Sequence, residues 1–296
     1  MEILTHIVTS EDAGRRIRQI LLSRLGISRS LIQRLRENDR VQLNGHPVFL
    51  TQYVQAGDIL SIDLQFDEDS TIIPEQMLLD IIYEDEDFLA LNKPPGIIVH
   101  PVGQEISGTL ANGVIHHWLE QGFRSKFRPI HRLDRNTSGL VLVGKNQFAH
   151  QSLYRQFAEH RVRRWYLALV EGYLSEPTGT ITAPIGRKPG SIVERWVSPD
   201  GQEAITHFEV LATSENASLL RLNLETGRTH QIRVHLQHLG HPLLGDTLYG
   251  GSSSLISRQA LHSFRFQFSH PRTSKTVTLE APLAPDIEKL LNVILS

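Results

Sequence analysis

One aspartate stands between two arginines in the segment 131–143, which reads His-Arg-Leu-Asp-Arg-Asn-Thr-Ser-Gly-Leu-Val-Leu-Val. Neighbouring positive charges favour the ionised form of a carboxyl group, so Asp134 is a candidate nucleophile or base at neutral pH. The turn-prone Asn-Thr-Ser-Gly and the apolar run 140–143 predict a loop beside a buried strand. The commoner alternative is a surface ion pair with Arg132 or Arg135.

A second candidate group lies on a predicted helix over residues 229–240. Its apolar residues recur at the spacing of one helix face, and Gly240 is expected to end it. The opposite face carries three polar residues, His230, Arg233 and Gln237. A helix holds a side chain more rigidly than a loop does, so Arg233 is preferred to Arg228, on the preceding turn, as the partner of Asp134. The alternative is an ordinary solvent-facing helix surface.

Tyr166 is a third candidate, because it lies in the run 161–172, whose β-branched and aromatic residues predict a strand. Its ring is suited to stack on a nucleobase and its hydroxyl to form a hydrogen bond. A half-buried strand tyrosine is the commoner explanation. A helix is expected over 146–160. The segment 81–91 reads as a hairpin, and the proline-rich segment 92–101 as a rigid loop that leads into another strand.

The composition is that of a globular protein with about two domains. The 296 residues are 40% hydrophobic and 21% charged, and none is cysteine, which excludes disulfides and thiolate metal sites. No metal site is expected, because a helix separates His230 from His235 by about 140° and no His-Glu-x-x-His pattern occurs. The N-terminus lacks a signal pattern and no apolar run is long enough for a membrane span, so we expect a cytoplasmic protein that binds no membrane.

The formal net charge of −2 hides a strong segregation of charge along the chain. Residues 11–40 contain eight arginines and four acidic residues. Residues 41–90 contain eleven acidic residues and no lysine or arginine, whereas 121–170 contain ten basic and two acidic residues. Clustered cations neutralise phosphates and so favour nucleic acid as a partner. Two solvated faces are the alternative.

The first basic block has the pattern of a small helix-and-strand module. Apolar residues at helical spacing end before Gly26, and Ser28 is placed to cap a second helix. Strand patterns follow, separated by the turn signal Asn44-Gly45. This order, with SRSLIQRLRENDRVQLNG and VQAGDILSI in these positions, resembles the alpha-L RNA-binding module, whose helix pair presents basic side chains to structured RNA. One departure is Arg18, which stands where the module usually has an aspartate.

This resemblance implies an alpha-L RNA-binding domain over residues 1–66. Residues 67–78 mix acidic residues with a proline and predict a linker, which leaves 79–296 for a second domain. The candidate RNA-binding residues of the first domain are Arg15, Arg29, Arg34 and Arg36.

Several motifs of the second domain resemble the RluA-type family of bacterial RNA pseudouridine synthases. They are HRLDRNTSGLVLV, the strand motif Arg-Arg-Trp-Tyr and LETGRTHQIRVHLQHLGHPLLGDTLYG, with LNKPPGIIVHP before them and RQALHSFRFQFSHP after them. The resemblance spans roughly 81–285 and implies an α+β fold with a mixed, mainly antiparallel sheet. It also implies that Asp134 is the catalytic aspartate, that Tyr166 stacks on the target base and that Arg233 pairs with the aspartate. Trp165 is bulkier than the threonine common in that strand motif.

The implied reaction converts specific uridines to pseudouridine, with large-subunit ribosomal RNA as the expected substrate. Asp134 would attack the substrate covalently or abstract a sugar proton, and the sequence leaves both routes open. We expect no cofactor, and a monomer. Further candidates for RNA contacts are Lys93, Arg132, Arg163, Arg164 and Arg228, while His131 is expected to shape the loop. The alternative function is a non-catalytic RNA-binding or ribosome-assembly factor with the same fold.

Overall fold

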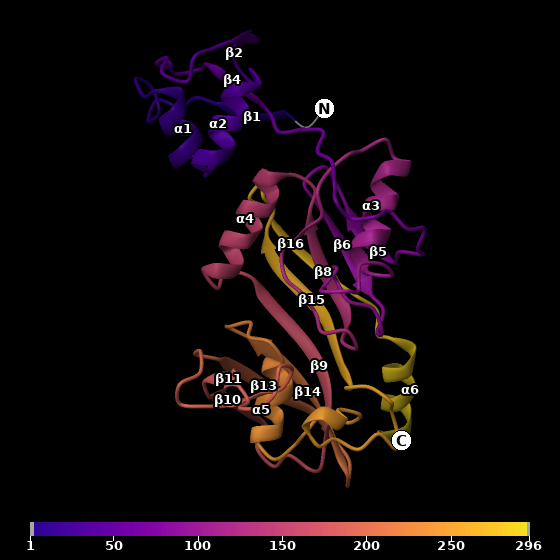
Figure 1. Ribbon diagram of the computed structural model, residues 1–296. Coiled ribbons are helices and arrows are strands. Elements are labelled where there is room, and N and C mark those ends of the chain that lie inside the picture. Colours follow the sequence, from indigo (N-terminus) through magenta and orange to yellow (C-terminus); the bar gives the residue numbers. More distant parts are fainter. Residues whose placement is uncertain (1–2, 295–296) are drawn as a thin grey trace.

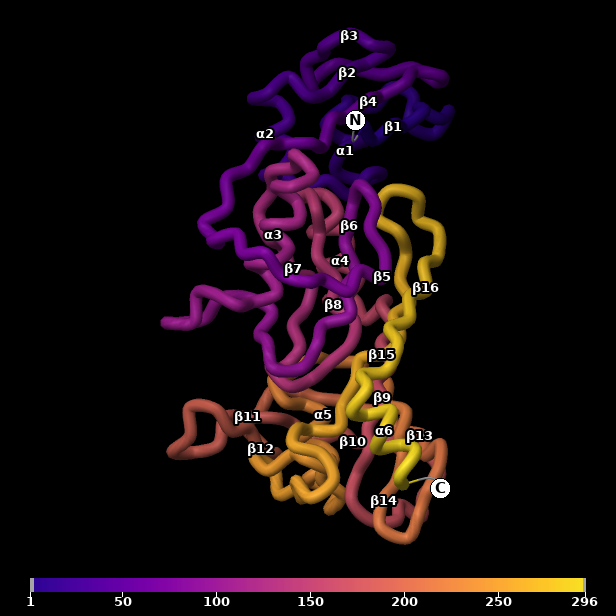
Figure 2. Tube along the Cα trace, turned by 90° about the vertical axis from the view of Figure 1, so that its right-hand side faces the viewer, coloured from indigo at the N-terminus to yellow at the C-terminus, as the bar shows by residue number. Residues whose placement is uncertain are grey.

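The computed structural model describes residues 3–294. The chain forms an elongated molecule with a small module at one end, which is followed by a large twisted sheet with helices packed on it (Figure 1 and Figure 2). Within the described residues, no helix combines the length and the apolar character needed to cross a membrane.

The small module combines two helices with a four-stranded sheet of order β1-β4-β2-β3. Its elements are β1 (Ile3–Ile7), α1 (Ile17–Ser23), α2 (Arg29–Glu37), β2 (Val41–Leu43), β3 (His46–Pro47) and β4 (Ile59–Asp63). As predicted, the Ser28 side chain caps α2 by accepting a hydrogen bond from the backbone N–H of Leu31 at 3.2 Å. Asn44 and Gly45 both have positive φ angles, 53° and 82°, which joins β2 to β3 in the tight turn that this pair favours.

The rest of the chain is built on a ten-stranded sheet whose main path has the order β10-β13-β14-β9-β15-β8-β6-β5, with β16 beside β15 and β7 beside β8. All neighbours are antiparallel except β15 and β8, so the predicted mixed, mainly antiparallel sheet is confirmed. The strands are β5 (Ile81–Glu84), β6 (Phe88–Lys93), β7 (Arg128–Pro129), β8 (Ser138–Gly144), β9 (Arg163–Glu171), β10 (Thr178–Thr182), β13 (Ile205–Thr213), β14 (Ala217–Leu224), β15 (Leu261–Ser269) and β16 (Thr276–Glu280). A separate hairpin is formed by β11 (Ile185–Arg187) and β12 (Arg195–Val197).

Strand β8 is buried on both faces, which explains why its sequence is continuously apolar rather than alternating. Leu140 and Leu142 pack in the cluster that contains Leu153 of α4 (Gln147–Ala158). Val141 and Val143 point to the other face, where α3 (Leu110–Glu120) covers them. The strand is therefore a rigid base for the loop that precedes it, which carries Asp134.

The other half of the sheet is covered by α5 (Gln231–His238) and α6 (Pro285–Ile294). Ile232 and Leu236 of α5 pack against apolar side chains of β9 and β14. Ile287 and Leu290 of α6 belong to a different cluster, together with Leu169 of β9. A short 3-10 helix, η1 (Thr247–Tyr249), follows α5.

Residues 67–78 contain no helix or strand, and hydrogen bonds join them to residues of the second domain. Glu68 accepts hydrogen bonds from Arg34 of α2, at 2.6 Å, and from Arg128 of β7. Farther on, the side-chain amide of Asn112 in α3 donates to the carbonyl oxygen of Ile73 at 2.7 Å. The segment is thus bound to both neighbours, and the domain boundary within it stays a prediction.

The strand that we expected after the proline-rich loop is wrong, because the chain enters α3 instead. Thr109 begins this helix with reciprocal bonds to Asn112, whose side chain accepts from the Thr109 N–H at 2.9 Å. The β-branched residues before it find no neighbouring strand. Val99, with 2% of its surface exposed, packs beneath α3, so its apolar character reflects burial rather than a strand.

Gly139 allows the two central strands to approach each other. It has a φ of 109° and pairs with Ser263 where β15 and β8 run in parallel. A Cβ atom at this position would lie 2.1 Å from the carbonyl oxygen of Ser263. Only glycine fits both the backbone angle and the space, so this residue sets the spacing of the strands beneath the Asp134 loop.

We expect Gly139→Ala to lower the free energy of unfolding by at least about 2 kcal/mol, because it adds a steric clash to an unfavourable φ. Gly57→Ala is the matched control, since Gly57 has a φ of 90° and a Cβ atom added there would meet nothing within 4 Å. It should lower stability by only about 1 kcal/mol. Denaturant unfolding followed by circular dichroism measures both, and equal losses would contradict the steric explanation.

Candidate active site

The backbone around Asp134 is fixed by hydrogen bonds from a buried lysine. The Lys93 ammonium donates to the carbonyl oxygens of Arg135, Pro94 and Ile97 at 2.8, 2.7 and 3.0 Å. Lys93 has no exposed surface, and burial lowers its pKa to about 7. The three hydrogen bonds use all the donors of the ammonium group. Lys93 therefore holds the loop next to Asp134 in place and is not positioned to contact an RNA phosphate.

Asp134 forms an ion pair with Arg233, as the sequence predicted. The Arg233 Nη1 atom lies 3.2 Å from Oδ2 of Asp134. The same guanidinium binds Asp246 through two nitrogens, each at 2.7 Å. Burial by itself lowers the pKa of Arg233, but its bonds to Asp246 and the charges of both carboxylates outweigh burial and raise that pKa. Arg233 is thus a permanently charged group aimed at Asp134.

The arginines next to Asp134 in the sequence do not pair with it. Arg135 turns to Glu105, with one nitrogen 2.9 Å from a carboxylate oxygen, and also donates to the carbonyl oxygen of Gly96. Arg132 is exposed. The surface ion pair considered as the alternative is therefore wrong, and the partner comes from a distant helix.

Asp134 and Tyr166 line the same cavity, which has a volume of about 740 Å³. Its walls come from the loop 130–136, the end of α4, β9 and the segment 224–233. This volume is within the usual range for sites that enclose a small molecule or a nucleotide. Tyr166 is 6% exposed, and burial raises the pKa of its hydroxyl, which therefore remains protonated at neutral pH.

His131 and Arg164, from the motifs around Asp134 and Tyr166, also line this cavity and fix its walls. His131 stacks on Phe157 at a ring distance of 5.4 Å, and its Nε2 atom accepts a hydrogen bond from the backbone of Leu142. Burial lowers the pKa of His131 to about 3, so it is neutral. The Arg164 guanidinium donates to three successive carbonyl oxygens, the nearest being that of Thr226 at 3.1 Å. It thereby fixes the turn that leads to α5.

The other basic residues predicted to contact RNA near this cavity differ in exposure. Arg132, Arg163 and Arg228 are exposed, and Arg132 and Arg228 line the cavity. Arg228 also donates from Nε to the carbonyl oxygen of Glu203 at 2.9 Å. Arg164 is 8% exposed and already engaged with the backbone. The exposed three thus remain the better candidates for phosphates.

The arginines of the small module fall into two groups. Arg15 is bound to Asp12 at 2.8 Å, and Arg34 is bound to Glu68. Within residues 3–294, by contrast, no side-chain hydrogen bond or ion pair engages Arg18, Arg29 or Arg36, all of which are exposed. The arginines of the second group line a cavity that we call the module groove.

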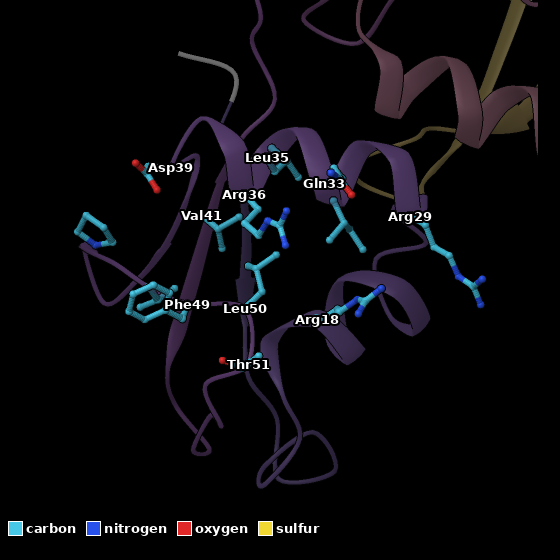
Figure 3. Close-up of a pocket in the computed structure, with 13 residues that line it drawn as sticks. Arg18, Arg29, Gln33, Leu35, Arg36, Asp39, Val41, Phe49, Leu50 and Thr51 are labelled. Carbon is cyan, nitrogen blue, oxygen red and sulfur yellow. The ribbon is translucent and has the colours of Figure 1, made fainter.

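The module groove is a cavity of about 510 Å³ between α1, α2 and the segment 47–51 (Figure 3). Arg18, Arg29 and Arg36 line it beside apolar residues such as Leu50. Phe49 also lines the module groove, and 84% of its surface is exposed. Unpaired cations beside an exposed ring offer both charge and a stacking surface.

Comparison with known proteins agrees with this geometry. The family model described as RNA pseudouridylate synthase matches residues 87–238, which include Asp134, Tyr166 and Arg233. The chain belongs to the RNA pseudouridine synthase family. The model of the RluD ribosomal pseudouridine synthase N-terminal domain matches residues 4–60 of the same chain.

Relatives of this pseudouridine synthase match over nearly its whole length. The uncharacterized RNA pseudouridine synthase YhcT of Bacillus subtilis is 42% identical over 98% of this chain and 97% of its own. Ribosomal large subunit pseudouridine synthase D of Neisseria meningitidis serogroup B is 37% identical over 97% of this chain and 80% of its own. The solved structure of human RNA Pseudouridylate Synthase Domain Containing 1 is 31% identical, with a TM-score of 0.60, over 72% of this chain and 87% of that one.

The sequence did not single out two residues around the ion pair of this pseudouridine synthase, namely Asp246 and Tyr249. Asp246 is 2% exposed and lies in a turn-rich stretch, Gly-Asp-Thr-Leu-Tyr-Gly, which indicates a loop but not its partner. The guanidinium of Arg233 lies over the ring of Tyr249, with 4.9 Å between the guanidinium carbon and the ring centroid. The predicted helix-face neighbour Gln237 is exposed and lies outside the cavity.

We expect Asp246→Asn to lower kcat for pseudouridine formation by up to about 100-fold, because the guanidinium of Arg233 loses the charge that aims it at Asp134. The KM for RNA should stay within about 2-fold, since Asp246 is buried away from the substrate. Glu209→Gln, which weakens a strand-to-strand pair with Arg221 outside the cavity, is the control. Steady-state kinetics on one RNA substrate compares them, and an unchanged kcat in Asp246→Asn would refute this aiming role.

Proposed function

We propose that this protein isomerises specific uridines of large-subunit ribosomal RNA to pseudouridine, with Asp134 as its catalytic carboxylate. The observation that carries the proposal is the arrangement of one cavity: Asp134 lies at its wall, held by Arg233, and Tyr166 lines it from β9. A non-catalytic RNA-binding factor would have no need of a carboxylate held in this way. All of these residues come from one chain, so the proposal is compatible with a monomer.

The reaction needs a reactive carboxylate but no external reactant. The bond between the ribose and the base nitrogen breaks, the base rotates, and the ribose joins a base carbon, which loses its proton while the nitrogen gains one. Asp134 serves either route to this product, as a nucleophile toward the substrate or as a base for a sugar proton. In both routes Arg233 orients the carboxylate and places a positive charge beside it.

Tyr166 is proposed as the platform for the target base. A base must leave its stack to enter the cavity, at a cost of a few kcal/mol, and stacking on an aromatic ring offsets about 1–3 kcal/mol of that cost. Its buried hydroxyl, protonated at neutral pH, remains a hydrogen-bond donor for a carbonyl group of uracil. We propose that Arg132, Arg163 and Arg228, which are all exposed, bind the adjoining phosphates.

The choice of ribosomal RNA rests on relatives and on the small module. Several relatives that match 95% or more of this chain are named ribosomal large subunit pseudouridine synthase D. The module groove adds Arg18, Arg29 and Arg36, which make no side-chain hydrogen bond or ion pair within residues 3–294 and lie in another part of the chain than Asp134. A large structured RNA offers phosphates to both sites. This substrate also implies that the protein acts in the cytoplasm.

We expect Asp134→Asn to reduce pseudouridine formation by roughly 100- to 10,000-fold while RNA affinity stays within about 3-fold. Unmodified transcripts of large-subunit rRNA, small-subunit rRNA and transfer RNA are incubated with each variant, and pseudouridine is mapped by carbodiimide-stalled primer extension. Asp200→Asn, on an exposed loop, is the control and should match wild type. Absence of product on every RNA with wild type would refute the enzyme proposal, and product only on another RNA class would refute the substrate.

If the module groove binds RNA phosphates, its arginines contribute to the salt dependence of RNA affinity. Replacing Arg18 and Arg36 together by alanine should lower RNA affinity and reduce the slope of log Kd against log salt concentration by about 2, one for each lost phosphate contact. Arg15→Ala is the matched control, because Arg15 is already paired with Asp12 and should change the slope by less than about 0.5. Filter binding at several salt concentrations gives the slopes. Equal changes per arginine in both variants would contradict the groove as a contact surface.

A further inference from the structure

His230 has an unusual backbone for the residue that begins a helix. It precedes α5 with φ 59° and ψ 18°, in the left-handed region that non-glycine residues seldom adopt. Ser28 and Asn146, which begin α2 and α4, have extended backbones and cap their helices with their side chains. His230 makes no such cap. The helix therefore begins under strain and without the usual bond, and strain of this kind gathers at functional sites.

The imidazole of His230 points at the carboxylate of Asp134 instead. Its Nε2 atom lies 3.8 Å from Oδ2 of Asp134, and 12% of the side chain is exposed. Both residues line the large cavity. The other ring nitrogen, Nδ1, lies 2.8 Å from the hydroxyl of Tyr249 on η1. His230 thus connects the catalytic carboxylate to a buried phenol.

Tyr249 determines which nitrogen of His230 carries the proton. The Tyr249 oxygen accepts a hydrogen bond from the backbone N–H of Arg195 at 2.9 Å. Among the hydrogen bonds of residues 3–294, the acceptor available to the phenol proton is Nδ1 of His230. A phenol that donates to Nδ1 leaves that nitrogen unprotonated, so the neutral ring carries its proton on Nε2, which faces Asp134.

The ring of His230 is neutral mainly because it is buried. Burial is the largest influence and lowers the pKa of His230. Arg233 of α5 and Arg195 of β12 lower that pKa further, while the carboxylates of Asp134 and Asp246 raise it. The net effect is a lowered pKa, and burial raises the pKa of Tyr249, so the phenol keeps its proton.

The two donors approach the same oxygen of Asp134. Arg233 Nη1 lies 3.2 Å from Oδ2, and His230 Nε2 faces Oδ2 as well. Within residues 3–294, no hydrogen bond engages Oδ1. Oδ2 thus accepts a hydrogen bond from a cation on one side and has a neutral ring nitrogen 3.8 Å away, in contact but beyond hydrogen-bond distance, on the other. Oδ1 is left for the substrate.

We propose that His230 is a positioning residue that, with Arg233, holds Oδ2 of Asp134 and so makes Oδ1 the oxygen that reacts with the substrate. This inference rests on the proposed function of Asp134. A neutral donor suits the task, because it orients the carboxylate without a second positive charge that would weaken its reactivity. His230 keeps its proton throughout, and the hydroxyl of Tyr249 fixes the tautomer that makes this possible.

Two conservative substitutions separate this role from a structural one. In His230→Gln the amide nitrogen takes the place of Nε2 and keeps a donor toward Asp134. In His230→Asn the side chain is too short to reach Asp134, but asparagine tolerates the left-handed backbone better than glutamine does. We expect kcat to fall by about 10- to 100-fold in His230→Asn, which loses the donor beside the Asp134 carboxylate, and by less than about 5-fold in His230→Gln. The KM for RNA should stay within about 2-fold in both.

The reverse order, with His230→Asn the more active variant, would show that His230 matters for its backbone alone and would overturn the proposal. A rise in KM with kcat unchanged would overturn it as well. Tyr249→Phe removes the group that sets the tautomer and should lower kcat by about 3- to 10-fold, about what one neutral hydrogen bond is worth. Thermal unfolding of each variant verifies that the fold is retained.

NMR spectroscopy tests this inference independently of the proposed function. In wild-type protein, 15N chemical shifts of the His230 ring, assigned by their loss in His230→Gln, should show a protonated Nε2 and an unprotonated Nδ1. The Nε2–H resonance should shift in Asp134→Asn. The opposite tautomer would overturn the proposal even in an active enzyme. Failure of wild type to make pseudouridine, with the expected tautomer present, would refute the proposed function and leave the contact between His230 and Asp134 established.

Discussion

The buried guanidinium of Arg233, shared between two carboxylates, is the interaction on which the rest of the site depends. A charge out of contact with water requires a partner, and Asp246 meets this need with two bonds of 2.7 Å. Asp134 is therefore not needed to neutralise the arginine and receives a single bond, at 3.2 Å. A carboxylate bound by both nitrogens would have both oxygens engaged. Because Asp246 neutralises Arg233, Asp134 keeps an oxygen available to react with a substrate.

This ion pair joins two halves of the sheet that meet at β9 and β15. Asp134 comes from the loop before β8, whose position follows from the close parallel approach at Gly139 and from the carbonyl contacts of Lys93. Arg233 comes from α5, which packs on β9 and β14. The distance between the two charges is thus set by backbone packing rather than by flexible side chains, which is what an oriented carboxylate requires.

The sequence allowed those features to be predicted whose cause is local. The continuous apolar run 140–143 indicates a strand buried on both faces, and a helix face is enough to select Arg233. Features that depend on distant backbone were missed. Lys93 was predicted in a proline-rich loop and as an RNA contact, but it is the last residue of β6, and the carbonyl oxygens it meets across the fold, such as that of Arg135, explain its burial. Asp246 gives no local signal because its partner lies on another element.

Helix α4 lies beside the small module (Figure 1) and contacts both the module and the cavity. Phe148, near its beginning, packs in the core of the module, and Arg155 lies against Gly26 there. Tyr154 and Phe157, toward its end, line the cavity that contains Asp134. Because one rigid element contacts both, an RNA bound by the module groove and by the cavity must offer its two contacts at a fixed spacing, and RNAs with another spacing lose one of them.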